Sequence, residues 1–209
     1  MAVATQASNR RALAKERRRQ QLIDATIKTI SRKGLGGLTL GDVAREAGLS
    51  QGIVNLHFES KDNLLNETLR YLADDYNSQF RTTYEKSGPD AAAKLLALME
   101  MDLKPSVCDR KKLAVWFAFW GEAKAVPTYQ KICDAYDKGY DETMLELCSD
   151  IIGEGGYRHV DAQTVTDALS SMTDGIWLSI LISPKSYDRN TARRAIYSYL
   201  KGVFPDHYR

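Results

Sequence analysis

The chain has 209 residues, 44% of them hydrophobic, so it can bury one or two cores and is not disordered in composition. Its longest apolar run, Leu113–Trp120, is far shorter than the roughly 20 residues that span a bilayer, and its first residues do not resemble a secretory signal, so we expect a cytoplasmic protein with no membrane partner. The net charge is only +2, but residues 1–70 contain 12 Lys and Arg against 7 Asp and Glu, whereas the rest contains 17 against 20, so only the N-terminal third suits a polyanion.

The reactive side chains do not form a catalytic or metal-binding pattern. Cys108, Cys133 and Cys148 lie far apart, without the close pairs of zinc or redox sites, and we interpret them as buried free thiols. The three histidines lie in separate regions, and the chain has neither a Gly-x-Ser-x-Gly elbow nor a phosphate loop. We therefore expect no enzyme activity, no catalytic residues, no metal and no cofactor.

The first predicted element is a helix from about Arg17 to Gly34. Apolar residues recur in it at helical spacing, at Leu22, Ile23, Ile27 and Ile30. The preceding residues, 1–16, are polar and basic, and we interpret them as a flexible arm.

Two short helices are predicted next. Thr39, with Asp42 three residues later, has the pattern of an N-cap with an acidic first turn. Gly48 suits the left-handed residue that ends this helix, and Ser50 can cap another helix at 51–58. Two short helices joined by a tight turn are typical of a helix-turn-helix.

The rest of the chain is predicted to be helical as well. A long helix begins after Ser60 and reaches the Ser87-Gly88-Pro89 breaker, and Gly153, Gly155 and Gly156 are interpreted as a loop. Further helices are predicted at about 90–103, 109–125, 127–152, 161–182 and 188–202. The expected fold is therefore all-α with about nine helices: a helix-turn-helix domain at 17–66 and a helical ligand-sensing and dimerisation bundle at 67–209.

The third predicted helix has polar residues that can read DNA. Gln51 and Asn55 can each form bidentate hydrogen bonds with adenine, and Gly52 permits close approach of the backbone. Any helical hairpin shares the bare pattern, so the pattern alone leaves a purely structural hairpin open.

A specific set of residues over about 17–70 narrows this choice. The set is Gly34, Thr39, Ala44, Ala47, Gly48, Ser50, Gly52, His57, Phe58, Lys61 and Leu64. In these residues the chain resembles the TetR family of transcriptional regulators. The resemblance implies that Gln51, Gly52 and Asn55 enter the major groove of double-stranded DNA.

The same resemblance implies contacts with phosphates from Thr39, Ser50, His57 and Lys61. The full set of predicted DNA-contacting residues is Thr39, Ser50, Gln51, Gly52, Ile53, Asn55, Leu56, His57 and Lys61. The family often has an aromatic residue just before the histidine, where this chain has Leu56, so the operator sequence is not transferable from relatives. The basic residues of the arm have two interpretations, a solvated terminus or a clamp on phosphates or the minor groove, and we favour the clamp because the arm adjoins the first helix.

Aromatic and acidic residues in the C-terminal two-thirds suggest a cation site. Ring faces attract a quaternary ammonium group, whose methyl groups offer no hydrogen bonds. The predicted ligand-binding residues are Trp116, Trp120, Tyr129, Tyr136, Asp174 and Trp177. Aromatic residues at helical spacing are more often core, and that alternative stays open.

Three segments refine the resemblance. Arg18–Thr26, Trp116–Trp120 and Asp174–Trp177 resemble the BetI branch of the family, repressors of glycine betaine synthesis that respond to choline. The resemblance implies a small-molecule inducer such as choline or a related quaternary amine. A TetR-type repressor or activator of another pathway, with an unrelated ligand, is the alternative, and a helical protein-binding adaptor is a third reading.

Binding of an inverted-repeat operator requires two copies of the chain, and the family pairs its last two helices as a four-helix bundle. The predicted dimer interface consists of Leu169, Met172, Gly175, Ile176, Ile180, Ala195 and Tyr199. A pair of helices packed within one chain is the alternative for the same apolar stripe.

Overall fold

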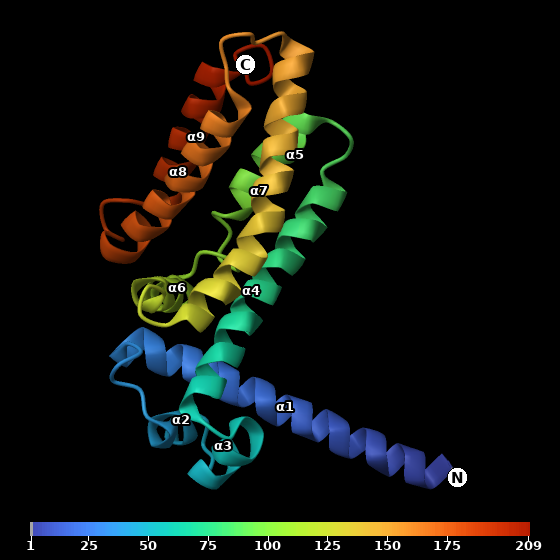
Figure 1. Ribbon diagram of the computed structural model, residues 1–209, viewed down its shortest axis with the longest axis vertical. Coiled ribbons are helices and arrows are strands. Elements are labelled where there is room, and N and C mark those ends of the chain that lie inside the picture. The colour runs from blue at the N-terminus through green and yellow to red at the C-terminus, as the bar shows by residue number, and fades with distance from the viewer. Residues whose placement is uncertain (1) are drawn as a thin grey trace. The chain divides into compact units, whose positions relative to one another are not determined.

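The computed structural model describes the backbone of residues 2–209 and the side chains of residues 10–135 and 138–209. Over the described backbone the protein consists of helices without strands (Figure 1), which confirms the predicted all-α class. The helices are α1 (Ala2–Lys33), α2 (Leu40–Glu46), α3 (Gln51–Phe58), α4 (Lys61–Lys86), α5 (Ala91–Met101), α6 (Arg110–Glu122), α7 (Pro127–Gly155), α8 (Ala162–Ile182) and α9 (Arg189–Val203).

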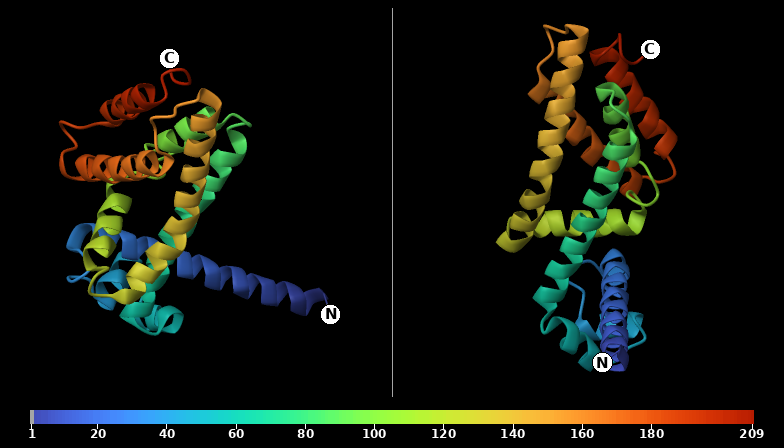
Figure 2. Two further views of the ribbon diagram at one scale, coloured as in Figure 1. Left: turned by 45° about the horizontal axis from the view of Figure 1, so that its top comes forward. Right: turned by 90° about the vertical axis from the view of Figure 1, so that its right-hand side faces the viewer.

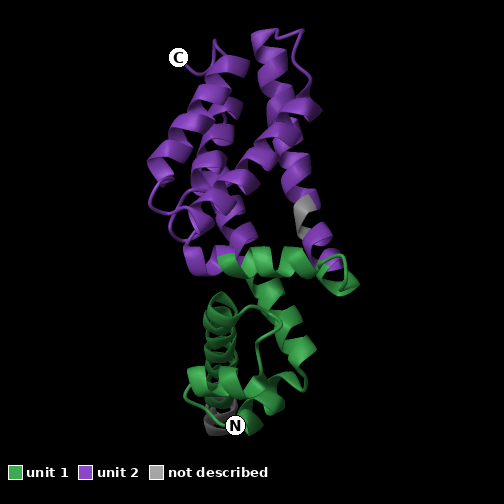
Figure 3. Cartoon of the chain, turned by 90° about the vertical axis from the view of Figure 1, so that its left-hand side faces the viewer, with its two compact units in different colours: residues 1–72, 114–129 green, residues 73–113, 130–209 purple. Residues whose placement is uncertain are grey.

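The chain forms two compact units (Figure 3). Unit 1 contains residues 1–72 and 114–129, and unit 2 contains residues 73–113 and 130–209. The end of α4 and the start of α6 therefore belong to unit 2, while the remainder of α6 belongs to unit 1. The sequence-based division placed 114–129 with the sensing bundle, and that functional division stays a prediction.

The start of α2 is fixed by hydrogen bonds around one carboxylate. The backbone N–H of Asp42 donates to Thr39 Oγ1 at 3.1 Å, and the backbone N–H of Thr39 donates to Asp42 Oδ2 at 3.3 Å, so the predicted cap is a complete capping box. Lys33 and Arg45 also donate to Asp42 Oδ1, at 2.8 and 3.0 Å. Asp42 thus ties the last turn of α1 to the first turn of α2.

The start of α1 differs from the prediction. The helix begins at Ala2 and not near Arg17. Residues 2–33 contain neither glycine nor proline and are rich in good helix formers, so helix formation continues beyond the apolar stripe that reveals it in the sequence.

The predicted loop at Gly153–Gly156 is also wrong in part. The helix α7 continues through Gly153 to Gly155, and the turn is made by Gly156, which has a φ of +63°. A Cβ atom at Gly155 would overlap the ring of Tyr157, which folds back over the end of the helix. Gly155 is therefore the last residue of α7 and leaves room for the ring of Tyr157, while Gly156 makes the turn that follows.

Unit 2 is closed by its C-terminal segment. In unit 2 the helices α8 and α9 lie side by side (Figures 1 and 2), and α9 also contacts α5. Beyond α9, Phe204 is fully buried and the hydroxyl of Tyr208 donates to the carbonyl of Ala92 at 2.8 Å.

Cys108 and Cys148 are buried free thiols as predicted, whereas Cys133 is half-buried. Over the described residues, no helix is long and apolar enough to cross a bilayer.

We expect Asp42→Ala to destabilise the folded protein at neutral pH, because the hydrogen bonds from Lys33 and Thr39 hold the pKa of this carboxyl well below its ordinary value. A carboxyl with a lowered folded-state pKa stabilises the fold above its unfolded pKa of about 4, and this contribution is lost as the pH falls further. Urea unfolding should therefore show a deficit at pH 7 that narrows below about pH 4. A deficit that is independent of pH would mean that the carboxylate charge is not what stabilises this junction.

Candidate DNA-binding and ligand-binding sites

The helix α3 has one buried face and one exposed face. Val54 and Phe58 are at most 1% exposed and anchor it in unit 1. Gln51 and Asn55 are exposed beside this buried side of the helix, whereas Leu56 points away from it and is 75% exposed. A short helix that is anchored by two buried residues and keeps two amide side chains exposed has the parts that direct reading of base edges requires.

The other predicted DNA-contacting residues differ in availability. Gly52 and Ser50 are exposed, Ile53 is half-buried, and the Ser50 side chain makes no cap hydrogen bond. Thr39 Oγ1 donates to Asp42 Oδ2 at 2.8 Å, so it would have to break this bond to donate to a phosphate. Thr39 therefore caps α2, and its contact with a phosphate stays a prediction.

His57 and Lys61 lie at the junction of α3 and α4. His57 Nδ1 is buried and has no hydrogen-bond partner among the described residues. Burial lowers the pKa of His57, and the positive charges of Lys15 and Arg18 lower it further, so a neutral imidazole is favoured. Lys61 is half-buried, and its Nζ donates to the carbonyl of Leu35 at 3.4 Å. In the DNA-free protein His57 therefore offers a neutral ring as a hydrogen-bond donor, whereas Lys61 carries a charge.

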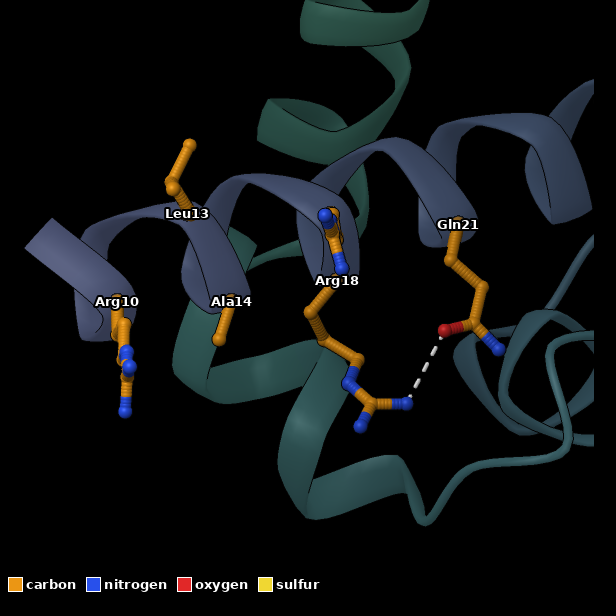
Figure 4. Close-up of a pocket in the computed structure, with 6 residues that line it drawn as sticks. Arg10, Leu13, Ala14, Arg18 and Gln21 are labelled. Atoms are coloured by element: carbon orange, nitrogen blue, oxygen red, sulfur yellow. Dashed lines mark hydrogen bonds between the residues drawn. The ribbon is translucent and has the colours of Figure 1, made fainter.

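One side of α1 carries basic residues. Arg10, Ala14, Arg18 and Gln21 point to the same side of the helix (Figure 4), and Arg18 donates to Gln21 Oε1 at 3.0 Å. A shallow groove is lined by Arg10, Leu13, Ala14, Arg17, Arg18 and Gln21.

Arg19 differs from its neighbours on α1. It forms an ion pair with Glu67 and lies 5.8 Å above the ring of Phe58, so it belongs to the packing of unit 1. Arg10, Arg17 and Arg18 are exposed and line a shared groove, and their action as a clamp on DNA stays a prediction.

The predicted ligand-binding residues fall into both compact units. In unit 1, Trp116 and Trp120 have ring centroids 5.9 Å apart, and Tyr129 packs edge to face on Phe119 at 4.9 Å. Trp116 and Tyr129 are largely buried. The side chain of Tyr136 lies outside the described residues. Convergence of these rings with Asp174 and Trp177 of unit 2 stays a prediction.

In unit 2, Trp177 contacts Asp102, an acidic residue that was not among the predicted ligand-binding residues. The indole N–H of Trp177 donates to the backbone carbonyl of Asp102 at 3.0 Å, and the Tyr76 hydroxyl donates to Asp102 Oδ1 at 2.8 Å. Asp102 is 1% exposed, whereas Asp174 is exposed and its pKa is raised by partial burial of its carboxyl group. A signal was present in the sequence, because Asp102 follows Leu95, Leu98 and Met99 at helical spacing and so continues the buried face of α5.

The predicted dimer residues differ in burial, and their place in a dimer interface stays a prediction. Leu169, Ile176 and Ile180 are at most 6% exposed and form part of the core of unit 2, so the intramolecular alternative applies to them. Met172 and Tyr199 are half-buried, and Gly175 and Ala195 are exposed. The exposed large apolar residues of α8 are Leu178, at 42%, and Ile182, at 67%.

Two family models match the chain. Residues 22–68 match the bacterial regulatory proteins of the tetR family, and residues 91–205 match the BetI-type transcriptional repressor C-terminal domain. Similar curated proteins include the HTH-type transcriptional regulators BetI of Paraburkholderia xenovorans LB400 and Paraburkholderia phytofirmans PsJN. Each is 30% identical over 186 residues, which cover 89% of this chain and 93% of the relative.

Solved structures show the same fold. A proposed transcriptional regulator from Pseudomonas aeruginosa PAO1 is 25% identical with a TM-score of 0.79, over 93% of this chain and 95% of its own. A proposed transcriptional regulator from Saccharomonospora viridis, solved in complex with choline, is 22% identical with a TM-score of 0.79, over 88% of this chain and 95% of its own. These relatives are regulators and not enzymes.

Proposed function

Because the chain belongs to the TetR family of transcriptional regulators and has a BetI-type C-terminal domain, we propose that it binds an inverted-repeat operator as a homodimer and releases it when a small quaternary amine binds. The observation that carries the proposal is the exposed amide-bearing face of α3, anchored by Val54 and Phe58. Leu56, which is 75% exposed on the side of α3 away from the core, could contact a thymine methyl group in the major groove.

The proposed roles on DNA follow from exposure and charge. Gln51 and Asn55 read base edges, and the backbone at Gly52 approaches the groove. Ser50 and Lys61 contact phosphates, where Lys61 adds its charge to the N-terminal turn of α4.

We expect Gln51→Ala or Asn55→Ala to relax base preference at particular operator positions, by about 1 to 3 kcal/mol each, because each loses a bidentate contact. Lys61→Ala should instead weaken binding to all sequences alike and flatten the dependence of log K on log salt by about one unit. Fluorescence anisotropy on fragments selected from the host DNA measures both, with Lys138→Ala on α7 as the control. Unchanged base preferences in both α3 variants would show that α3 is not the recognition helix.

The proposed dimer uses the exposed side of α8. Ser171, Gly175, Leu178 and Ile182 repeat at four, three and four residues, so they share one face of this helix. Leu178 and Ile182 are large apolar side chains that are exposed in the single chain. A second copy of α8 packed on this face would cover both.

We expect Gly175→Arg and Leu178→Asp to yield folded monomers that lose tight operator binding, because two linked half-site readers gain effective concentration that separate monomers lack. Sedimentation measures the assembly and anisotropy measures the binding. Leu13→Asp, which changes an exposed leucine of α1, is the matched control for added charge and should remain a dimer. An intact dimer in both α8 variants would place the interface elsewhere.

The structural neighbour from Saccharomonospora viridis, a proposed regulator solved in complex with choline, supports a quaternary amine as the inducer. The aromatic side chains of unit 2 support it chemically, since each contact between a cation and a ring contributes about 0.5 to 2 kcal/mol. To act as an inducer, the ligand must bind the state with low DNA affinity more tightly than the other state.

We expect choline to bind with measurable heat at about millimolar concentration and to release the operator, and Trp177→Ala to weaken both effects because a ring is lost. Trp177→Phe, which keeps an aromatic ring, should be weakened less and controls for misfolding. Absence of heat, or equal binding in the Trp177→Ala variant, would indicate a regulator of the same family with a different ligand.

A further inference from the structure

Asp102 is a buried carboxyl group with an incomplete set of hydrogen bonds. It follows the last residue of α5 and is 1% exposed. Tyr76 donates to Oδ1, but no described residue donates to Oδ2. The Thr173 hydroxyl lies near enough to lower the pKa of Asp102, yet it forms no hydrogen bond of normal geometry. A carboxylate with a bare oxygen in an apolar interior is costly unless a charge or a donor completes it.

The surrounding groups do not supply that charge. Facing Asp102 are Tyr76 from α4, Tyr140 from α7, Asp174 from α8 and Cys108 from the segment after α5. None of these is cationic, and Asp174 adds a like charge. Arg189 of α9 donates to Cys108 and not to Asp102.

Electrostatics therefore favours the neutral acid in the ligand-free protein. Burial raises the pKa of Asp102 to about 7, and the charge of Asp174 contributes in the same direction. The position at the C-terminal end of α5 is also unfavourable for a negative charge, because the helix dipole is negative there.

Aromatic rings connect this acid to a groove at the surface of unit 2. The rings of Tyr76 and Trp177 are 6.0 Å apart and nearly perpendicular, at 83°. Tyr140 lies 6.4 Å from Tyr76 and 5.3 Å from Phe80. Phe80 and Tyr140 line an open groove of about 600 Å³, whose lining residues come from α4 and α7. The Tyr140 hydroxyl is also buried without a hydrogen bond of normal geometry.

We propose that Asp102, and not the sequence-predicted Asp174, is the counter-charge of the cationic ligand in unit 2, and that ligand binding expels a proton from Asp102. The inference rests on the proposed function, because it assigns the charge-recognising residue for that quaternary amine. The step is balanced: the neutral carboxyl group releases its proton to the buffer, and the resulting carboxylate pairs with the cation while Tyr76 and Trp177 provide ring contacts.

Proton release makes ligand affinity depend on pH. With a ligand-free pKa of about 7, the ionised fraction of Asp102 rises about tenfold from pH 6 to pH 8, and the apparent affinity for a cation should rise by the same factor. Heats of binding should also vary with the ionisation enthalpy of the buffer near pH 7, because one proton is transferred to it.

The stability of the ligand-free protein provides a second readout. A carboxyl with a raised folded-state pKa stays protonated in the folded protein while the unfolded chain ionises, so the folded state loses stability between about pH 4 and pH 7. Asp102→Asn should therefore raise the melting temperature at pH 8 and change it little at about pH 4. If Asp102 served the fold as a carboxylate, the same substitution would lower the melting temperature at pH 8.

The test is calorimetry with choline and with its neutral carbon isostere, 3,3-dimethylbutan-1-ol, at pH 6 and pH 8. We expect the wild type to prefer choline, and Asp102→Asn to lose choline affinity by at least about 30-fold at pH 8 while affinity for the neutral isostere is retained. Asp174→Asn should keep most of the choline preference. Asp150→Asn, an exposed acid on α7, is the matched control and should behave as the wild type.

The outcomes separate this inference from the proposed function. If the wild type binds choline but Asp102→Asn binds it equally, without dependence on pH, the role of Asp102 is overturned and the quaternary-amine repressor stands. A loss confined to Asp174→Asn would return the role to Asp174. If the wild type binds neither compound, both the ligand class and the role of Asp102 are overturned, while operator binding is still judged by anisotropy.

Discussion

The arrangement of unit 1 depends on burial of one side of α3. Val54 and Phe58 reach into the core, where Arg19 covers the ring of Phe58 and pairs with Glu67 of α4. Because a helix has a fixed periodicity, anchoring these two positions also sets the direction of Gln51 and Asn55. The capping box at Thr39 fixes the start of the preceding helix. Packing therefore determines which amides meet solvent, and DNA would find them already oriented.

Unit 2 contains a buried carboxyl group, that of Asp102, whose hydrogen bonds are incomplete among the described residues. Asp102 accepts one side-chain hydrogen bond and has a second acid nearby. A buried acid with incomplete hydrogen bonds lowers the stability of the folded protein, but it gains more from a bound cation than an acid whose hydrogen bonds are complete. Such losses of stability are common at functional sites. Tyr76 and Trp177 each donate a hydrogen bond to Asp102, so their rings are held beside this acid.

Helices that carry an apolar stripe were predictable from the sequence, and so were the capped junction at Thr39 and the exposed side of α3. The start of α1 was not, because exposed residues without Gly or Pro leave no periodic signal. On α8, periodicity identified Leu169, Ile176 and Ile180 as apolar but could not tell a core within one chain from an interface between two. Asp102 was missed although it continues the apolar stripe of Leu95, Leu98 and Met99, because an acid at the end of a helix is usually solvated.

The continuous helix at the N-terminus also limits how much positive charge any one surface can meet. An extended arm could turn each of its cations toward the same polyanion. In a helix, successive side chains are rotated by about 100°, so residues that are adjacent in the chain point in different directions. Of the six basic residues at Arg10, Arg11, Lys15, Arg17, Arg18 and Arg19, three line the groove of α1 and one is paired with Glu67. A count of basic residues in the sequence therefore overstates the counterions that this segment can displace.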